Sequence, residues 1–115
     1  MREILFRGKR VGNGEWIEGY YFRQYGSNEI VTADDEIYHI TPETVGQYTG
    51  LTDKNGLTKI FEYDIIDANG RKVGNYYENS NLLKDGTCFL VAKMGTKEWS
   101  RSEQEAIKRG CKYAE

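Results

Sequence analysis

The sequence predicts a mainly β protein, either a small antiparallel barrel or a pair of packed antiparallel sheets, that ends in a short helix. Three observations predict this class. Apolar and polar residues alternate along several short runs, which is the pattern of strands with one buried face. The 115 residues include 13 glycines and one proline, which favours many turns over long helices. Asn-Gly pairs at positions 13–14, 55–56 and 69–70 indicate tight reversals of the chain.

The length and the tyrosine content indicate one folded domain. A chain of 115 residues fits a single domain that needs no metal or disulfide, so residues 1–115 are expected to form one domain. The apolar fraction is only 38%, but nine tyrosines add ring area that can be buried while each hydroxyl stays hydrated. Tyrosine is also common at protein interfaces, so these rings can serve a core or a contact surface.

Charge and cysteine usage exclude several classes of protein. The net charge of −2, with both signs interspersed, gives no general attraction to nucleic acid or to an anionic membrane. Two cysteines outside any CxxC pair and one histidine cannot form a structural zinc site without carboxylates, so no metal and no cofactor are expected. No run resembles a signal peptide or reaches membrane-spanning length. The sequence therefore predicts a cytoplasmic protein with free thiols and no membrane partner.

The first half of the chain is expected to alternate between strands and turns. Strands are expected at Glu3–Arg7, Trp16–Gln24, Glu29–Thr32, Glu36–Ile40, Val45–Thr49 and Leu57–Ile66. Turns are expected at Asn13–Gly14, Tyr25–Asn28, Ala33–Asp35, Thr41–Thr44 and Asp53–Gly56. The first two strands should pair as an antiparallel hairpin. Within the second strand, Trp16 and Tyr20 should share one face, with Tyr21 and Arg23 on the other.

The second half is expected to be less regular and to end in a helix. Lys72–Glu78 reads as one more strand, which Gly74 weakens. Thr87–Lys93 is short and apolar, which is typical of a buried strand. A helix is expected at about residues 101–109, because two Ser-x-x-Glu spacings resemble capping boxes and Gly110 is a natural stop. This helix is too short to persist alone, so it must dock on the sheet or on a partner.

Four blocks of the sequence resemble the YopX family of phage and prophage proteins. They are ILFRGKR (Ile4–Arg10), NGEW (Asn13–Trp16), PETVGQYTGLTDKNG (Pro42–Gly56) and KIFEYDI (Lys59–Ile65). The resemblance covers residues 2–66 and implies a mostly β protein encoded by bacteriophages or prophages of bacteria. It supplies no catalytic or ligand-binding residues. The family usually has glycine where this chain has Tyr63, which marks a turn or bulge there, and residues 67–115 depart from the family pattern.

One surface stands out as a candidate binding site. Basic and aromatic residues of the first two predicted strands could gather on a single sheet; they are Arg7, Lys9, Arg10, Trp16, Tyr20, Tyr21 and Arg23. Such a combination can bind single-stranded nucleic acid or nucleotides by charge and stacking. The alternative is a solvated hairpin whose charges protect a strand edge from pairing.

No catalytic constellation is visible in the sequence. His39 is expected to be structural, because a general base would need an orienting carboxylate and a nucleophile nearby. Cys88 is expected to be buried and inert within its strand, and Cys111 to be a plain surface cysteine. The acidic residues at 34–36 and the segment 53–56 lack the full spacing of a calcium loop and are expected to be ordinary turns.

The sequence therefore predicts a non-enzymatic phage or prophage accessory protein that binds a host or phage macromolecule. A homo-oligomer is expected, since exposed strand edges and a helix with little apolar surface both favour assembly. The alternative is a nucleic-acid or nucleotide binder, acting in phage DNA metabolism or in sequestering a signalling nucleotide of host defence. An enzyme is the least favoured class, because no nucleophile–base pair or metal cluster is present.

Overall fold

The structure is a computed structural model that describes residues 4–114 of the chain. These residues contain nine strands, two α-helices and one 3₁₀ helix, so the predicted mainly β class is confirmed. The strands pack as antiparallel sheets, and within the described residues they form no closed barrel. Packed sheets are therefore the correct one of the two expected architectures. No helix between residues 4 and 114 is long and apolar enough to cross a membrane.

The chain divides into two compact units. The described residues 4–48 form the N-terminal unit and residues 49–114 form the C-terminal unit. In chain order the elements are β1 (Phe6–Arg10), β2 (Trp16–Gln24), β3 (Ser27–Val31), β4 (Ile37–Thr52), β5 (Lys59–Phe61), β6 (Asp64–Ile66), β7 (Lys72–Asn75), α1 (Tyr76–Asn79), η1 (Ser80–Leu83), β8 (Phe89–Leu90), α2 (Trp99–Lys108) and β9 (Lys112–Tyr113). The prediction that residues 1–115 form one domain stays a prediction.

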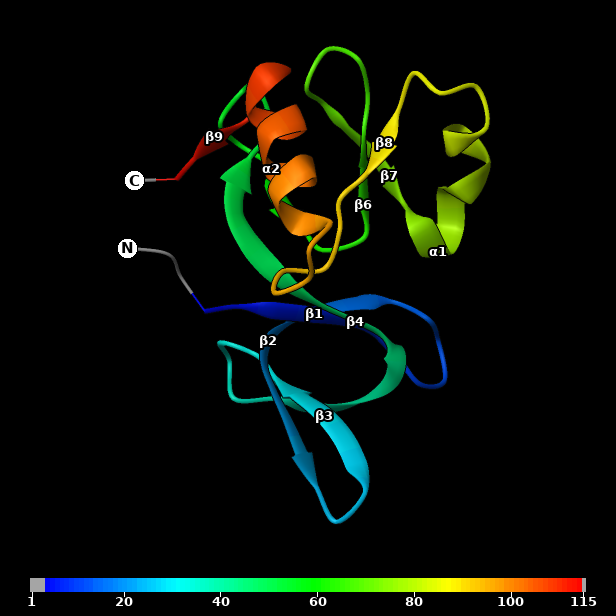
Figure 1. Cartoon of the computed structure of the whole chain (residues 1–115). Helices are drawn as coiled ribbons and strands as arrows, with labels where there is room; N and C mark the ends of the chain where they lie inside the picture. Colours follow the sequence, from blue (N-terminus) through cyan, green and yellow to red (C-terminus); the bar gives the residue numbers. More distant parts are fainter. Residues whose placement is uncertain (1–3, 115) are drawn as a thin grey trace. The chain divides into compact units, whose positions relative to one another are not determined.

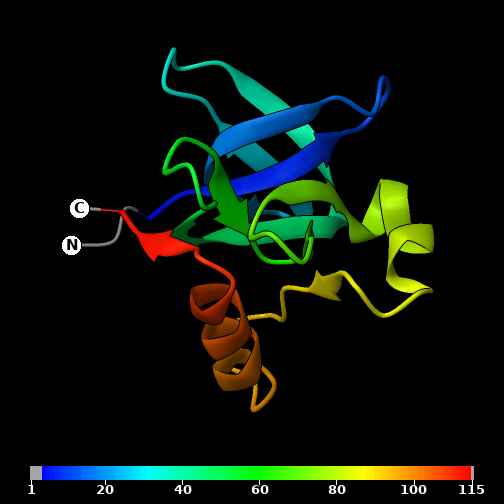
Figure 2. The ribbon, with the colours of Figure 1, turned by 90° about the horizontal axis from the view of Figure 1, so that it is seen from above.

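Four strands build the N-terminal unit. β1 and β2 form the predicted hairpin, in which Gly12 and Gly14 adopt φ of 106° and 72°. β2 then changes partner, because its residues up to Gly19 pair with β1 and those from Tyr20 onward pair with β3. β3 pairs with the start of β4, and β1 pairs with a later part of β4. The β2–β3 hairpin consequently leaves β1 beyond Gly19 (Figure 1), and the blue and cyan ribbons of this unit curl strongly (Figure 2).

Two glycines permit this curl by allowing backbones to approach closely. A Cβ at Gly19 would lie 2.1 Å from the carbonyl oxygen of Val31, and a Cβ at Gly8 would lie 2.3 Å from a methyl group of Ile40. The fully buried Ile30 lies next to both glycines, 2.9 Å from the Cβ position of Gly19 and 3.6 Å from that of Gly8. The core of this unit therefore requires glycine on β1 and β2 as well as the apolar side chains that pack against these glycines.

β4 runs unbroken through the segment Thr41–Thr44, which the sequence predicts to be a turn. The register with β1 shifts between Arg7 and Lys9, so residues of this segment bulge out of the ladder. Thr44 fills the gap, because its Oγ1 accepts a hydrogen bond from the Lys9 amide at 2.8 Å and donates one to the Thr41 carbonyl at 2.6 Å. The predicted turn is wrong, and the bulge accommodates Pro42, which has no N–H to give to a ladder.

The C-terminal unit contains a helix that the sequence does not predict. The expected strand Lys72–Glu78 ends at Asn75, and α1 follows it directly. The Asn75 side chain accepts hydrogen bonds from the amides of Tyr77 at 3.0 Å and Glu78 at 3.1 Å, and it donates one to the Glu78 carboxylate at 3.0 Å. This reciprocal arrangement is a helix cap, so Asn-x-x-Glu at 75–78 was the sequence signal for the helix.

A tight turn splits the predicted strand Leu57–Ile66 into β5 and β6. Tyr63 adopts a φ of 70°, which confirms the turn or bulge expected where the family has glycine. Asp64 is fully buried and holds this turn, because its Oδ2 accepts a hydrogen bond from the Phe61 amide at 2.7 Å. The Lys72 ammonium lies 3.2 Å from the same oxygen. The carboxylate therefore has a structural role here.

Two elements near the end of the chain, β8 and α2, have other bounds than the sequence predicts. The predicted strand Thr87–Lys93 shrinks to β8, because its partner β6 is only three residues long. Cys88 consequently lies outside the strand and is half-buried rather than buried. α2 begins at Trp99, and no side-chain cap forms, so the expected capping boxes are wrong. Ser102 instead faces the unit's interior, where its Oγ accepts a hydrogen bond from the Ala92 amide at 3.0 Å.

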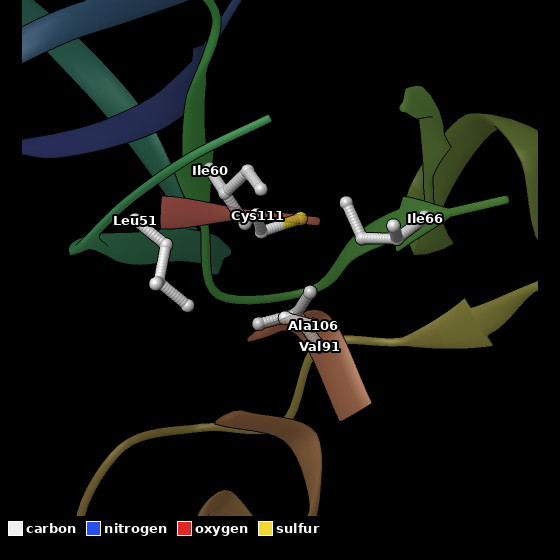
Figure 3. Packing of buried hydrophobic residues seen from close by; sticks show 6 residues of the cluster. All are labelled: Leu51, Ile60, Ile66, Val91, Ala106 and Cys111. Atoms are coloured by element: carbon white, nitrogen blue, oxygen red, sulfur yellow. The ribbon is translucent and has the colours of Figure 1, made fainter. Parts of the chain in front are cut away.

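The core of the C-terminal unit gathers side chains from strands and from α2. Its six buried members are Leu51, Ile60, Ile66, Val91, Ala106 and Cys111 (Figure 3). Cys111 is only 2% exposed, so the expectation of a surface cysteine is wrong. Burial, with a smaller effect of the Asp53 carboxylate, raises the pKa of its thiol to about 11. The prediction failed because β9, which follows Cys111 and pairs with β4, draws the chain back over the core.

Candidate functional site

The outward face of the N-terminal unit carries an exposed apolar row. Tyr20 of β2 lies directly opposite Val31 of β3, and Val31 lies directly opposite Ile37 of β4. Residues directly opposite one another project to the same face of a sheet. Tyr20 is 67% exposed and Ile37 is 59% exposed, whereas Ile30, on the other face, is fully buried. This row, called the apolar row below, is therefore directed to solvent.

Polar and charged groups flank the apolar row on the same face. The next row contains Phe22, Glu29 and His39, which also lie opposite one another. His39 Nδ1 lies 3.5 Å from the Glu29 carboxylate. On the β1 side, Arg7 lies opposite Glu18. Because Arg7 is only 4% exposed, the face presents apolar side chains together with the Glu18 and Glu29 carboxylates, and aromatic residues within a polar rim are typical of a protein-contact surface.

The structure divides the predicted basic and aromatic surface between two faces. Lys9 lies opposite Trp16 and Arg7 opposite Glu18, so these residues share the face of Tyr20. The remaining members have the opposite parity, because Arg10 lies opposite Ile40 and Tyr21 opposite Ile30. Arg23 also belongs to the second set and is exposed near the hairpin tip. The seven residues therefore do not form one continuous patch.

Cations of the same unit already cover two of its aromatic rings. The Arg7 guanidinium lies 4.6 Å from the centre of the Trp16 ring, and the Lys9 ammonium lies 5.6 Å from it. Arg7 itself is only 4% exposed. The Arg10 guanidinium lies 4.7 Å from the centre of the Tyr38 ring. These ring faces and cations satisfy one another, so they offer less to a stacked base or a phosphate than the sequence suggests.

Tyr38 belongs to a small polar group at the end of β1. Its hydroxyl donates a hydrogen bond to the Glu36 carboxylate, and this bond, more than burial, raises the pKa of the phenol. Arg10 acts in the opposite direction. The acidic segment at 34–36 forms the β3–β4 turn, in keeping with the prediction. Thr32 closes this turn, because its amide donates to the Glu36 carbonyl at 2.9 Å and its Oγ1 accepts from the Glu36 amide at 3.2 Å.

The tip of the β2–β3 hairpin presents a single aromatic side chain. Gln24 and Ser27 are the last paired residues, so Tyr25 and Gly26 alone form the turn. Their φ values are 51° and 79°. Tyr25 is 98% exposed. The Tyr21 hydroxyl donates a hydrogen bond to the Asn28 side chain across the hairpin, which stiffens the arm that carries the tip.

The structure brings Ser27, Glu29 and His39 together, a grouping that the sequence does not reveal. Ser27 Oγ lies 3.2 Å from His39 Nδ1, the same ring nitrogen that faces Glu29. In a catalytic triad the carboxylate and the nucleophile use different ring nitrogens. The His39 side chain is also 69% exposed. The group therefore lacks the geometry of a charge-stabilised base, and His39 fits a surface pairing role.

Between residues 4 and 114, no group of three or more His, Cys, Asp or Glu side chains is placed to hold a metal ion. Alternation along the second strand predicts the exposed face of Tyr20. The neighbouring positions of Val31 and Ile37 in the apolar row follow only from the strand register.

The comparisons with known proteins agree with the resemblance. The family model described as YopX protein matches residues 6–73, which is more than half of the 115 residues. The match includes β1 to β6 and therefore the whole apolar row. Neither the curated proteins nor the solved structures gave a match.

Proposed function

Because the chain belongs to the YopX family, we propose that it is a phage-type accessory protein that binds a protein of the phage or of its bacterial host. Family membership indicates the phage-type origin. The binding role is supported by the apolar row, because solvent-directed tyrosine and isoleucine side chains on a regular sheet cost free energy unless a partner covers them. The protein would act in the cytoplasm of the host by binding its partner, and it would catalyse no reaction. Its two free cysteines fit a reducing compartment.

Charge favours a protein partner over nucleic acid. Nucleic-acid affinity grows with the number of lysines and arginines that reach phosphates. On the face of the apolar row, Glu18 and Glu29 accompany Arg7 and Lys9, and both cations are drawn to Trp16. Tyrosine with a charged rim is instead the usual composition of a protein-contact surface.

The alternative, a nucleic-acid or nucleotide binder, is supported by one observation. Arg23 and Tyr25 are both exposed at the hairpin tip, where a base could stack and a phosphate could pair. Binding of this kind would weaken steeply with salt, because it would release counterions.

Site-specific photo-crosslinking in infected cells tests the proposal. A photoreactive amino acid replaces Ile37, and in a matched control it replaces Leu57, which is 87% exposed in the other unit. We expect position 37 to crosslink one defined protein, and Tyr20→Ser to reduce that yield about tenfold through lost apolar contact. Equal labelling at both positions, or a product removed by nuclease, would contradict the protein-binding proposal.

A further inference from the structure

The second half of β2 has an open edge. Residues Tyr20–Gln24 pair with β3 on one side, and no strand between residues 4 and 114 pairs with them on the other. β1 occupies that side only up to Gly19. Figure 1 shows the β2–β3 hairpin running away from β1 beyond this point, which leaves the edge clear of the first strand.

The direction of the backbone groups on this edge follows from the hairpin hydrogen bonds. The Arg10 amide donates to the Glu15 carbonyl at 2.8 Å. Alternate residues of a strand direct their N–H and C=O to opposite edges. Odd-numbered residues of β2 therefore face β1, and beyond Gly19 the N–H and C=O of Tyr21 and Arg23 face the open edge.

We propose that two copies of this chain associate by antiparallel pairing of these edges, with Phe22 of one copy opposite Phe22 of the other. In this register Tyr21 lies opposite Arg23 of the second copy, and Arg23 opposite its Tyr21. Both pairs can exchange two backbone hydrogen bonds, so the contact supplies four. The interaction is a two-fold strand addition, which is a recognised mode of association for exposed edges.

The composition of the edge identifies a second copy as its occupant. The sequence of residues 20–24 is YYFRQ, with no proline and no lysine, and the β2–β3 register has no bulge. Proline, lysine and bulges protect an edge from pairing, and none of the three occurs in this segment. Its one charge, Arg23, would lie opposite a tyrosine ring rather than another arginine. Aromatic residues also face each other at the centre, so the segment is complementary to itself.

This dimer would enlarge the candidate binding surface. Directly opposite residues share a face, so Phe22 of both copies would project to the same side. The apolar rows of the two copies would then lie on one face of a continuous sheet. The dimer does not depend on the proposed function, because it can form whether or not a host or phage protein is bound.

Sedimentation equilibrium of the purified chain up to about 1 mM tests the pairing, since small interfaces are weak. The informative variant is Arg23→Pro, which removes an outward N–H and leaves the bonds to β3 intact. Arg23→Val is the matched control, because it loses the same charge but keeps the N–H. We expect Arg23→Pro to raise the dimer dissociation constant by roughly 30-fold, through two lost hydrogen bonds. Arg23→Val should stay close to the original chain.

A second pair of variants tests the register and does not rely on proline being tolerated. Phe22→Lys and Phe22→Glu each place like charges opposite one another in the dimer, so each alone should associate more weakly. An equimolar mixture should restore association to a level roughly tenfold tighter than either variant alone. The proposal fails if the original chain is monomeric throughout, if Arg23→Val weakens the dimer as much as Arg23→Pro, or if mixing restores nothing. In that last case the edge would serve a different strand.

Discussion

Tyr25 occupies a backbone conformation that favours glycine or asparagine. With φ of 51° at Tyr25 and 79° at Gly26, both turn residues lie in the left-handed region, where asparagine followed by glycine is the preferred pair. A tyrosine there costs free energy, and its side chain is 98% exposed and gains no packing in return. A residue that is unfavourable for its backbone conformation and gains no packing indicates selection for a property other than stability.

We therefore expect Tyr25→Asn to raise the free energy of unfolding by about 1 kcal/mol. Urea denaturation followed by circular dichroism measures the change. Tyr20→Asn is the control, because it places the same side chain in a strand with ordinary backbone geometry, where asparagine is unfavourable. A loss of stability in Tyr25→Asn would show that the tyrosine at the tip supports the hairpin itself.

The buried thiol of Cys111 gives the fold a pH dependence. Burial raises its pKa from 9.0 to about 11, so the folded chain holds this proton more tightly than the unfolded chain does. Below pH 9 the thiol is protonated in both states and its contribution is fully present. Between pH 9 and about 11 the unfolded state loses the proton first, and stability falls.

We expect a thiol reagent at pH 8 to label Cys88 in the folded chain and Cys111 only after unfolding, because Cys111 is buried and protonated. Mass spectrometry of labelled peptides distinguishes the two sites. In Cys111→Ala, the part of the stability loss between pH 9 and 11 that comes from this thiol should disappear. Fast labelling of Cys111 in the native chain would mean that this core opens readily.

At the scale of elements, the change of partner along β2 depends on Gly19. A Cβ at this position would lie 2.1 Å from a backbone carbonyl oxygen, which cannot rotate away. We expect Gly19→Ala to lower the free energy of unfolding by about 3 kcal/mol, the upper range for overpacking. Gly8→Ala is the matched comparison and should cost less, because its new Cβ would meet a side-chain methyl of Ile40 at 2.3 Å rather than a backbone atom of the sheet. Equal losses in thermal denaturation of the two variants would contradict this distinction.

The elements that were predicted correctly are those whose signals are local. The hairpin at Asn13–Gly14 and the strand Trp16–Gln24 follow from turn residues and alternation, and both are present. The errors occur where a distant partner decides. β4 continues through Pro42 because the Thr44 side chain replaces a ladder bond to β1, and β8 is short because β6 is short. Neither fact is contained in the segment concerned.

For the whole molecule, the prediction of one domain implies that the two units unfold together. Each unit contains one of the two tryptophans, Trp16 in the N-terminal unit and Trp99 in the C-terminal unit. β4 forms ladders in both units, through β1 and β3 in one and β9 in the other. Melting of either unit should therefore destabilise the other.

We expect Trp16→Phe and Trp99→Phe, each with one remaining tryptophan, to show coincident urea transitions within each variant by selectively excited tryptophan fluorescence and by far-ultraviolet circular dichroism. The circular dichroism signal reports both units, so it is the internal control in each variant. A fluorescence midpoint that departs from it by more than the measurement error would show two domains that unfold separately.

The candidate site was predictable only in part, because its residues are brought together by the fold of the whole molecule. Composition identified the aromatic and basic residues of the first two strands, and Tyr20 does lie on an exposed face. Charge alone could not show that Arg7 and Lys9 both lie over the Trp16 ring, or that Arg10 lies over the Tyr38 ring. Those pairings depend on strand register, which arises from the fold rather than from any short segment.

The partner change at Gly19 also constrains how relatives of this chain can vary in length. The alternation of residues along β2 decides which side chains face solvent, and it also decides which amides face the open edge. A single inserted or deleted residue would therefore turn the exposed side chains to the buried face and the outward amides to the other edge. The turn glycines at 12, 14, 26 and 56 have empty space around them. Length differences among homologous sequences should therefore occur mainly at those turns, while the spacing from Trp16 to Gln24 stays constant.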